Sequence, residues 1–140
     1  MFSGNYEHKV DLKGRVPIPA KFRRELKGTL VLARVADPCI TAYPIAEWEK
    51  VGKKLGSSVI DKARVRDLKR YLIGSAFPSN LDDQGRVLLP QPLRDYAGIR
   101  DDVTIVGTGD RFEIWDQEAF QKRMAALDQD AYTLIESLEE

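Results

Sequence analysis

Two stretches of this chain match each other: Val10-Asp11-Leu12-Lys13-Gly14-Arg15-Val16-Pro17-Ile18-Pro19 and, 71 residues later, Leu81-Asp82-Asp83-Gln84-Gly85-Arg86-Val87-Leu88-Leu89-Pro90. The similarity continues beyond them, because Phe22-Arg23 corresponds to Leu93-Arg94. After one inserted residue, Ile40-Thr41-Ala42-Tyr43 aligns with Phe112-Glu113-Ile114-Trp115. The same features therefore occur twice in the same order, which indicates an internal duplication.

Each copy has the pattern of a hairpin followed by a helix and two further strands. Residues of high β-propensity flank Gly14 and Gly85, and glycine suits a tight turn that requires a positive φ. Pro19 and Pro90 end the second strand of each hairpin, since proline cannot donate to a β-ladder. Helices are expected over 20–26, 62–73, 91–97 and 128–140, and strands over 29–34, 39–43, 103–106 and 111–115.

Half of a 140-residue chain is too small to bury a core of its own. We therefore expect an α+β fold in which two tandem β-hairpin units pair within the chain as a pseudo-twofold β-barrel with flanking helices. The expected ranges are 5–50 for the first unit, 51–75 for a connecting helix, 77–122 for the second unit and 123–140 for a C-terminal helix.

The charges are balanced in number but unevenly distributed. Residues 1–27 hold seven basic and three acidic side chains, whereas residues 100–140 hold four basic and eleven acidic ones. A basic face opposite an acidic one can attract phosphates while the whole chain stays neutral. We find no apolar run of the length that a membrane helix needs and no secretory signal at the N-terminus, so a cytoplasmic protein without a membrane partner is expected.

The sequence offers little for an enzyme. His8 and Cys39 are the single histidine and the single cysteine, so no His/Cys metal cluster is possible. No phosphate-binding glycine motif is present, and no pair of carboxylates stands out by its spacing. We expect no catalytic residues, no metal, no cofactor and no small-molecule substrate, and we expect Cys39 to be a small buried apolar side chain.

The ordered motifs resemble the MraZ family, whose two halves belong to the AbrB-type swapped-hairpin superfamily. These motifs are Met1-Phe2-x-Gly4, Asp11 to Arg15, Asp82 to Arg86, Tyr43-Pro44-x-x-Glu47-Trp48, Arg94-x-Tyr96-Ala97-Gly98, and Val106-Gly107 with Phe112-Glu113-Ile114-Trp115. The resemblance implies a nucleoid-associated transcriptional regulator that binds short direct repeats in double-stranded promoter DNA. It also implies a ring-like homo-oligomer that controls its own cell-division and cell-wall operon.

The same resemblance points to the two Asp-x-x-x-Arg hairpins as the loops that face DNA. The candidate DNA-binding residues are Lys13, Gly14, Arg15, Gln84, Gly85, Arg86, Arg23 and Arg24. Glycine lets a backbone approach phosphates, lysine neutralises them, and arginine can donate two hydrogen bonds to guanine. The family often has a basic residue at the position of Ser3, and Gln84 stands where the first copy has Lys13, so the two copies are unequal.

Two other interpretations stay open at this point. Asp11 and Asp82 can be structural residues that pair with the arginines and brace the hairpins, and this role is compatible with DNA contact. Arg23 and Arg24 can belong to a solvated helix face. For the whole protein, the alternative function is an AbrB-like antitoxin or protein-interaction module.

Overall fold

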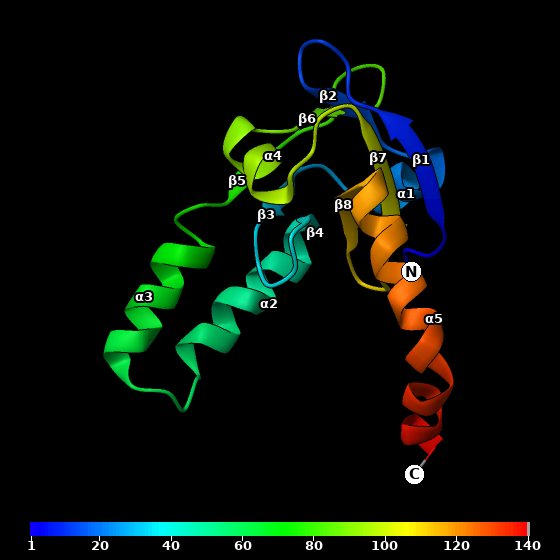
Figure 1. The fold of residues 1–140 in the computed structure, drawn as a ribbon. Helices are drawn as coiled ribbons and strands as arrows, with labels where there is room; N and C mark the ends of the chain where they lie inside the picture. The colour runs from blue at the N-terminus through cyan, green and yellow to red at the C-terminus, as the bar shows by residue number, and fades with distance from the viewer. Residues whose placement is uncertain (140) are drawn as a thin grey trace.

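The computed structural model describes residues 1–139 and confirms a mixed α+β fold (Figure 1). These residues form a six-stranded antiparallel sheet in the order β1-β7-β8-β4-β3-β5 and a separate two-stranded antiparallel ribbon of β2 and β6. The strands are β1 (Asn5–Lys9), β2 (Arg15–Pro17), β3 (Leu30–Ala33), β4 (Ile40–Pro44), β5 (Phe77–Ser79), β6 (Arg86–Leu88), β7 (Asp102–Gly107) and β8 (Phe112–Asp116). The helices are α1 (Ala20–Glu25), α2 (Ile45–Gly56), α3 (Lys62–Leu72), α4 (Gln91–Ala97) and α5 (Gln117–Glu139).

The first strand of each copy pairs with a strand of the other copy. Strand β1 runs antiparallel to β7, with Asn5 opposite Val106 and Lys9 opposite Asp102. Strand β5, the counterpart of β1, runs antiparallel to β3, with Leu30 opposite Ser79. Each copy thus lends its first strand to the sheet of the other, and neither copy has a complete sheet by itself.

The register of two further strand pairs marks an internal pseudo-twofold axis. In the ribbon, Val16 of β2 lies opposite Val87 of β6, and these two residues are equivalent in the repeat. In the large sheet, Thr41 of β4 lies opposite Glu113 of β8, which are again equivalent positions. Equivalent residues that face each other in antiparallel strands are what a twofold axis through both pairs requires, so the expected pairing of the two units is confirmed.

Closure of these strands into one barrel stays a prediction, because the six-stranded sheet ends in β1 and β5 and the ribbon is paired separately. The ranges 5–50, 51–75, 77–122 and 123–140 also stay predictions as units. Helix α2 runs across the limit at 50/51, and α5 runs across the limit at 122/123. The last residue of the C-terminal range, 140, lies outside the described residues.

One core is shared by both copies. It contains Val16, Ile18 and Phe22 of the first copy together with their equivalents Val87, Leu89 and Leu93 of the second, all at most 1% exposed. Phe22 lies at its centre, since its ring contacts those of Phe2, Tyr6 and Phe112 at centroid distances of 5.2, 5.4 and 5.2 Å. Burial of apolar surface contributed by both halves supplies the driving force that each half lacks alone.

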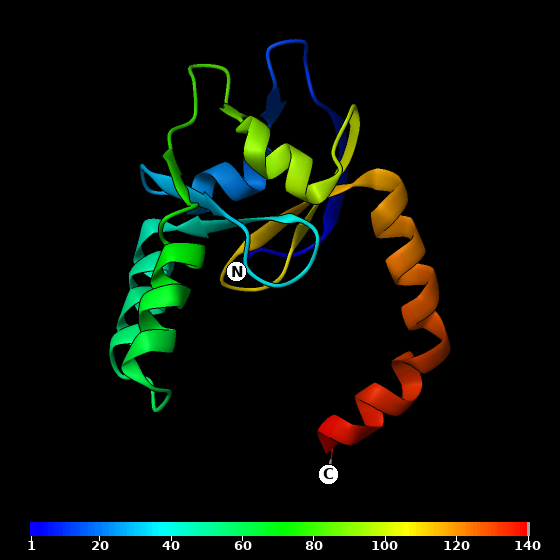
Figure 2. The same ribbon diagram turned by 60° about the vertical axis from the view of Figure 1, so that its left-hand side comes forward.

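The helices α2, α3 and α5 project from one end of the sheet (Figure 2). The connecting helix expected over 62–73 is α3, which starts after Asp61, whose carboxylate accepts the Arg64 backbone N–H, and α2 ends before it at Gly56. The described part of the C-terminal segment expected to be helical, residues 128–139, is the end of α5, which is continuous from Gln117 to Glu139. No helix within residues 1–139 has both the length and the apolar character needed to cross a membrane.

Candidate nucleic-acid interface

Two loops project side by side from the end of the molecule opposite to α2, α3 and α5 (Figures 1 and 2). The first hairpin loop, residues 10–14, joins β1 to β2, and the second hairpin loop, residues 80–85, joins β5 to β6. They lie together because each leads directly into a strand of the β2–β6 ribbon, whose pairing holds their bases next to each other. The duplicated motif of the sequence is therefore a pair of adjacent loops in space.

In the first hairpin loop, Asp11 fixes the backbone of the turn. Its Oδ1 accepts the backbone N–H groups of Lys13 and Arg15, both at 2.9 Å, and its carbonyl accepts the Gly14 N–H at 3.0 Å. This is the local hydrogen bonding by which aspartate stabilises turns. The tip of the loop is Leu12 and Lys13, and both side chains are exposed to solvent.

The second hairpin loop repeats this arrangement around Asp82. Its Oδ1 accepts the backbone N–H groups of Gln84 and Arg86 at 2.9 Å, and its carbonyl accepts the Gly85 N–H at 3.0 Å. The pKa of each aspartate is lowered, chiefly by the hydrogen bond from the backbone of its arginine, which favours the charged carboxylate. The two loops have the same backbone hydrogen bonds and differ in their tip side chains.

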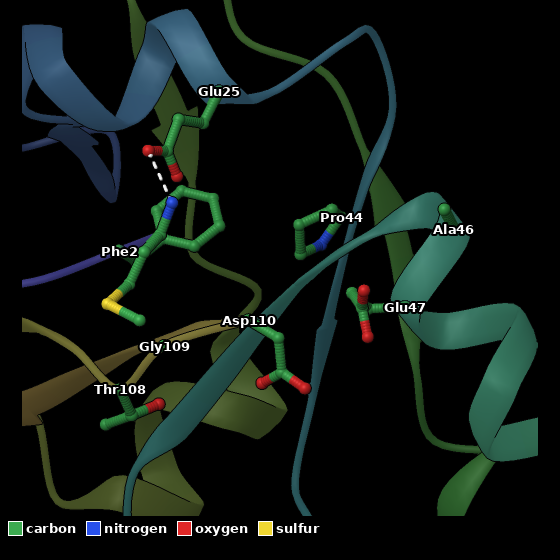
Figure 3. A pocket seen from close by; sticks show the side chains of 9 residues that line it. Phe2, Glu25, Pro44, Ala46, Glu47, Thr108, Gly109 and Asp110 are labelled. Atoms are coloured by element: carbon green, nitrogen blue, oxygen red, sulfur yellow. Dashed lines mark hydrogen bonds and ion pairs between the residues drawn. The ribbon is translucent and has the colours of Figure 1, made fainter.

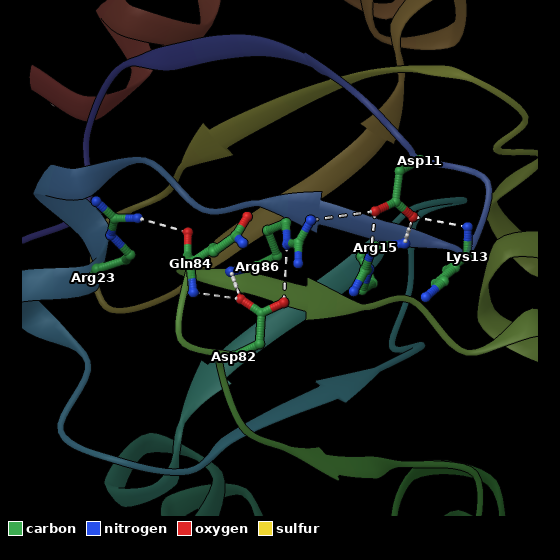
Figure 4. A network of polar contacts seen from close by, with 7 residues as sticks. All are labelled: Asp11, Lys13, Arg15, Arg23, Asp82, Gln84 and Arg86. Carbon is green, nitrogen blue, oxygen red and sulfur yellow. Dashed lines mark hydrogen bonds and ion pairs between the residues drawn. The ribbon is translucent and has the colours of Figure 1, made fainter.

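The same aspartates hold the arginines of the motif (Figure 4). Arg15 donates its Nε–H to Asp11 Oδ2 at 2.9 Å, and Arg86 donates its Nε–H to Asp82 Oδ2 at 2.9 Å. A weaker pair crosses between the copies, with Arg86 Nη1 3.9 Å from Asp11 Oδ2. In the structure each aspartate thus pairs with the arginine of its own hairpin.

Gly14 and Gly85 occupy positions that require glycine. Their φ angles are +85° and +75°, in the left-handed region that other residues avoid. Each glycine carbonyl also accepts a backbone N–H from the other copy, from Leu89 to Gly14 at 2.8 Å and from Ile18 to Gly85 at 3.0 Å. The two hairpin loops are thus tied to each other by backbone hydrogen bonds at their bases.

Arg23 lies against the second hairpin loop, although it belongs to the first copy. Its Nη1 donates to the Gln84 carbonyl at 3.5 Å, and its side chain occupies the space in which a Cβ at Gly85 would stand. Arg24 is exposed on α1, and no contact of its side chain with either loop is recorded in residues 1–139. Of the two predicted helix arginines, the structure brings Arg23 to the loops and leaves Arg24 on the helix face.

Arg94, the repeat equivalent of Arg23, is a neighbour of the loops that the sequence-based site did not include. Its Nε–H donates to the Leu89 carbonyl at 3.0 Å, and its guanidinium carbon lies 3.2 Å from the position of a Cβ at Gly14. Each loop therefore has beside it an arginine from the helix of the other copy. The repeat contained the signal, because Arg94 aligns with Arg23 at the same offset as the hairpins.

A hollow near the N-terminus is lined by acidic side chains, in contrast to the arginines and the lysine at the two hairpin loops (Figure 3). It has a volume of about 650 Å³, and its lining includes the carboxylates of Glu25, Glu47 and Asp110. The N-terminal ammonium of Met1 pairs with Glu25 at 2.9 Å, so the lining positive charge is already neutralised. This lining is unfavourable for phosphate, which leaves the two hairpin loops as the candidate interface.

Comparison with known proteins gives the same picture of a duplicated chain. The family model described as "MraZ protein, putative antitoxin-like" matches the sequence over residues 1–70 and again over 72–135, one match for each copy. A relative from Dehalococcoides mccartyi (strain BAV1) is 43% identical over 141 residues, with 100% of this chain and 99% of the relative covered. The chain belongs to the MraZ family. Other MraZ relatives are those of Roseiflexus castenholzii, 39% identical over 100% of this chain and 98% of the relative, and Syntrophomonas wolfei, 48% identical over 84% and 82%.

All three relatives bear the name "Transcriptional regulator MraZ". The residues that carry the resemblance in this chain, Asp11, Arg15, Asp82 and Arg86, are those that the fold brings together in the paired loops. The family expected from the sequence is therefore confirmed.

Proposed function

We propose that this chain is a sequence-specific, DNA-binding transcriptional regulator and that the two hairpin loops form its DNA-contacting face. The observation that carries the proposal is the pair of arginines Arg15 and Arg86, each braced by an aspartate at the base of adjacent, projecting loops. The names of the relatives support regulation of transcription as the purpose of this face.

The bracing suits base recognition. Because Asp11 and Asp82 accept hydrogen bonds from the Nε–H of their arginines, and the only Nη contact with them is the weak 3.9 Å pair of Arg86 Nη1 with Asp11, the Nη groups can donate to guanine O6 and N7 in the major groove. The side chains of Arg15 and Arg86 are 28% and 26% exposed, so they lose less freedom on binding than a fully solvated arginine would. Lys13 and Gln84 at the tips, with Gly14 and Gly85 behind them, would contact phosphates, and Arg23 would add a positive charge at the second loop.

We further propose that the protein acts in the cytoplasm, associated with the nucleoid, as a ring-like homo-oligomer on short direct repeats of double-stranded promoter DNA. Its own cell-division and cell-wall operon is the proposed target. These points rest on the resemblance to the family. A single copy offers two loops side by side, and several copies in one ring would contact several repeats together, which gives steep salt dependence through counterion release.

The test is a gel-shift titration of the purified protein against the DNA upstream of its own gene. We expect Arg15→Ala to weaken specific binding by about 5- to 150-fold, which corresponds to loss of a bidentate arginine–guanine contact of about 1–3 kcal/mol. Arg64→Ala is the matched control, because Arg64 lies on α3, away from the loops, with its side chain 76% exposed. Unchanged affinity of Arg15→Ala, with normal oligomer size by light scattering, would contradict a direct contact.

The second candidate function is an antitoxin-like module, which the family's description as "putative antitoxin-like" favours. A regulator binds promoter DNA as the purified chain alone, whereas an antitoxin requires a stable complex with a toxin. If the purified chain fails to bind its upstream DNA but neutralises a toxin expressed beside it, the second function replaces the first.

A further inference from the structure

The tip of the first hairpin loop carries an apolar side chain that no other residue covers. Leu12 is 107% exposed, whereas its repeat equivalent at the tip of the second loop is Asp83. A leucine in this position contributes nothing to the core. Its apolar surface gains free energy only when something apolar covers it.

The two tips can be compared directly, because their backbones are built in the same way. Leu12 directly follows Asp11, and Asp83 directly follows Asp82. In each turn the Oδ1 of that aspartate accepts the backbone N–H groups of the residues two and four positions after it. The side chains at these two positions therefore point from equivalent places in equivalent turns. What differs between the loops is the chemistry offered to a ligand: leucine with Lys13 in one, aspartate with Gln84 in the other.

We propose that Leu12 determines sequence specificity by packing on the 5-methyl group of a thymine in the major groove. This inference rests on the proposed function and names one base that the first hairpin loop selects. Among the groups that base pairs present in the major groove, the thymine methyl is the apolar one. Lys13 next to Leu12 and Arg15 at the base of the same loop supply the phosphate and guanine contacts that would bring Leu12 to the base edges.

The second hairpin loop cannot make this contact. The carboxylate of Asp83 is repelled by phosphates, and its favourable partner on a base edge is the N4 amino group of cytosine. The first and second hairpin loops are thus expected to select different bases, thymine for the first and cytosine for the second. A DNA site recognised by both loops would be asymmetric, even though the protein backbone has a pseudo-twofold axis.

The test removes the methyl group from the DNA instead of changing the base pairing. The full-length protein is titrated with the fragment upstream of its own gene, made once with thymine and once with deoxyuracil at every thymine. We expect the uracil fragment to bind about fourfold more weakly, the factor that corresponds to about 0.8 kcal/mol for burial of one methyl-sized group. Single thymine-to-uracil replacements then assign the effect to a position in the site.

The protein variants decide whether Leu12 is responsible. Leu12→Asn, which replaces the apolar tip with a polar one of similar size, should bind both fragments equally, while Leu138→Asn, at an 86% exposed position on α5 away from the loops, should keep the fourfold difference. Asp83→Leu should increase the difference, because both tips would then prefer the methyl group. Equal binding of the two fragments by the wild type, or the same difference in Leu12→Asn, would overturn the assignment. Failure of the wild type to bind either fragment would instead overturn the proposed function, and this inference with it.

Discussion

Replacement of Gly85 by alanine tests whether the close approach of Arg23 to the second hairpin loop matters for DNA binding. The new Cβ would lie 2.7 Å from Cδ and 2.8 Å from Cζ of Arg23 and would overlap its Nη1. The atoms in the way belong to the outer half of a flexible side chain. Arg23 should therefore swing away from the loop, and the backbone should stay where it is.

The two effects of this substitution can be separated. The φ of +75° costs an alanine about 1 kcal/mol of folding free energy. Gly98→Ala carries the same kind of cost, since Gly98 has a φ of +65° and open space around its Cβ position. Both variants should thus lose about 1 kcal/mol of stability, but only Gly85→Ala should displace an arginine from the candidate interface.

Urea unfolding followed by circular dichroism, at one protein concentration, measures the stability of both variants. Gel shifts over a range of salt concentrations measure the DNA interaction. If Arg23 contacts one phosphate, Gly85→Ala and Arg23→Ala should each reduce the slope of log affinity against log salt by about 0.9, and the double variant should lose no more than either. Additive losses in the double variant, or an equal loss of affinity in Gly98→Ala, would refute this reasoning.

Three further predictions concern stability and reactivity. Phe22→Ala should cost about 3–5 kcal/mol in urea unfolding, because a fully buried ring at the centre of the shared core is lost; a cost below 1 kcal/mol would contradict its central place. The lowered pKa values of Asp11 and Asp82 give stability that is present above the unfolded pKa of about 3.9 and is lost as the pH falls through the folded values. The double Asp-to-Asn variant should therefore lose less stability than the wild type between pH 5 and pH 3. Burial raises the pKa of the Cys39 thiol to about 12, so a thiol reagent at pH 8 should label the protein only after unfolding in guanidinium; prompt labelling of the native protein would show that Cys39 is accessible.

The repeat predicted most of the local structure. Helix α4 has the expected limits, and α1 and α3 end one residue earlier than expected. Asp116 caps α5, with its Oδ2 accepting the Ala119 N–H at 3.1 Å. Sequence patterns of this kind are local, and the limits of helices are their weakest point: nothing breaks the helix near 128, so the C-terminal segment simply continues α5.

The pairing of strands between copies was harder to predict. A strand of three residues such as β5, Phe77–Ser79, carries too little pattern to choose between a neighbour in its own copy and one in the other copy, and the shared core decides. The side chains near the loops could not be placed from the sequence for the same reason, since their surroundings depend on how the two copies pack together. Arg94 reaches Gly14 only because the copies interlock, and Leu12 stands out only when its exposure is known.

The exchange of first strands also determines how long β1 must remain unpaired while the chain is being synthesised. Asn5 pairs with Val106, so β1 leaves the ribosome about one hundred residues before its partner β7 exists, a delay of about 5–20 s at about 5–20 residues per second. During this time β1 is an unpaired strand in the cell. Its sequence, Asn-Tyr-Glu-His-Lys, is the most polar of the large sheet, and charged strands resist pairing with the wrong chain. The strand that stays unpaired for the longest part of synthesis is thus also the one whose polar, charged side chains best resist pairing with another chain.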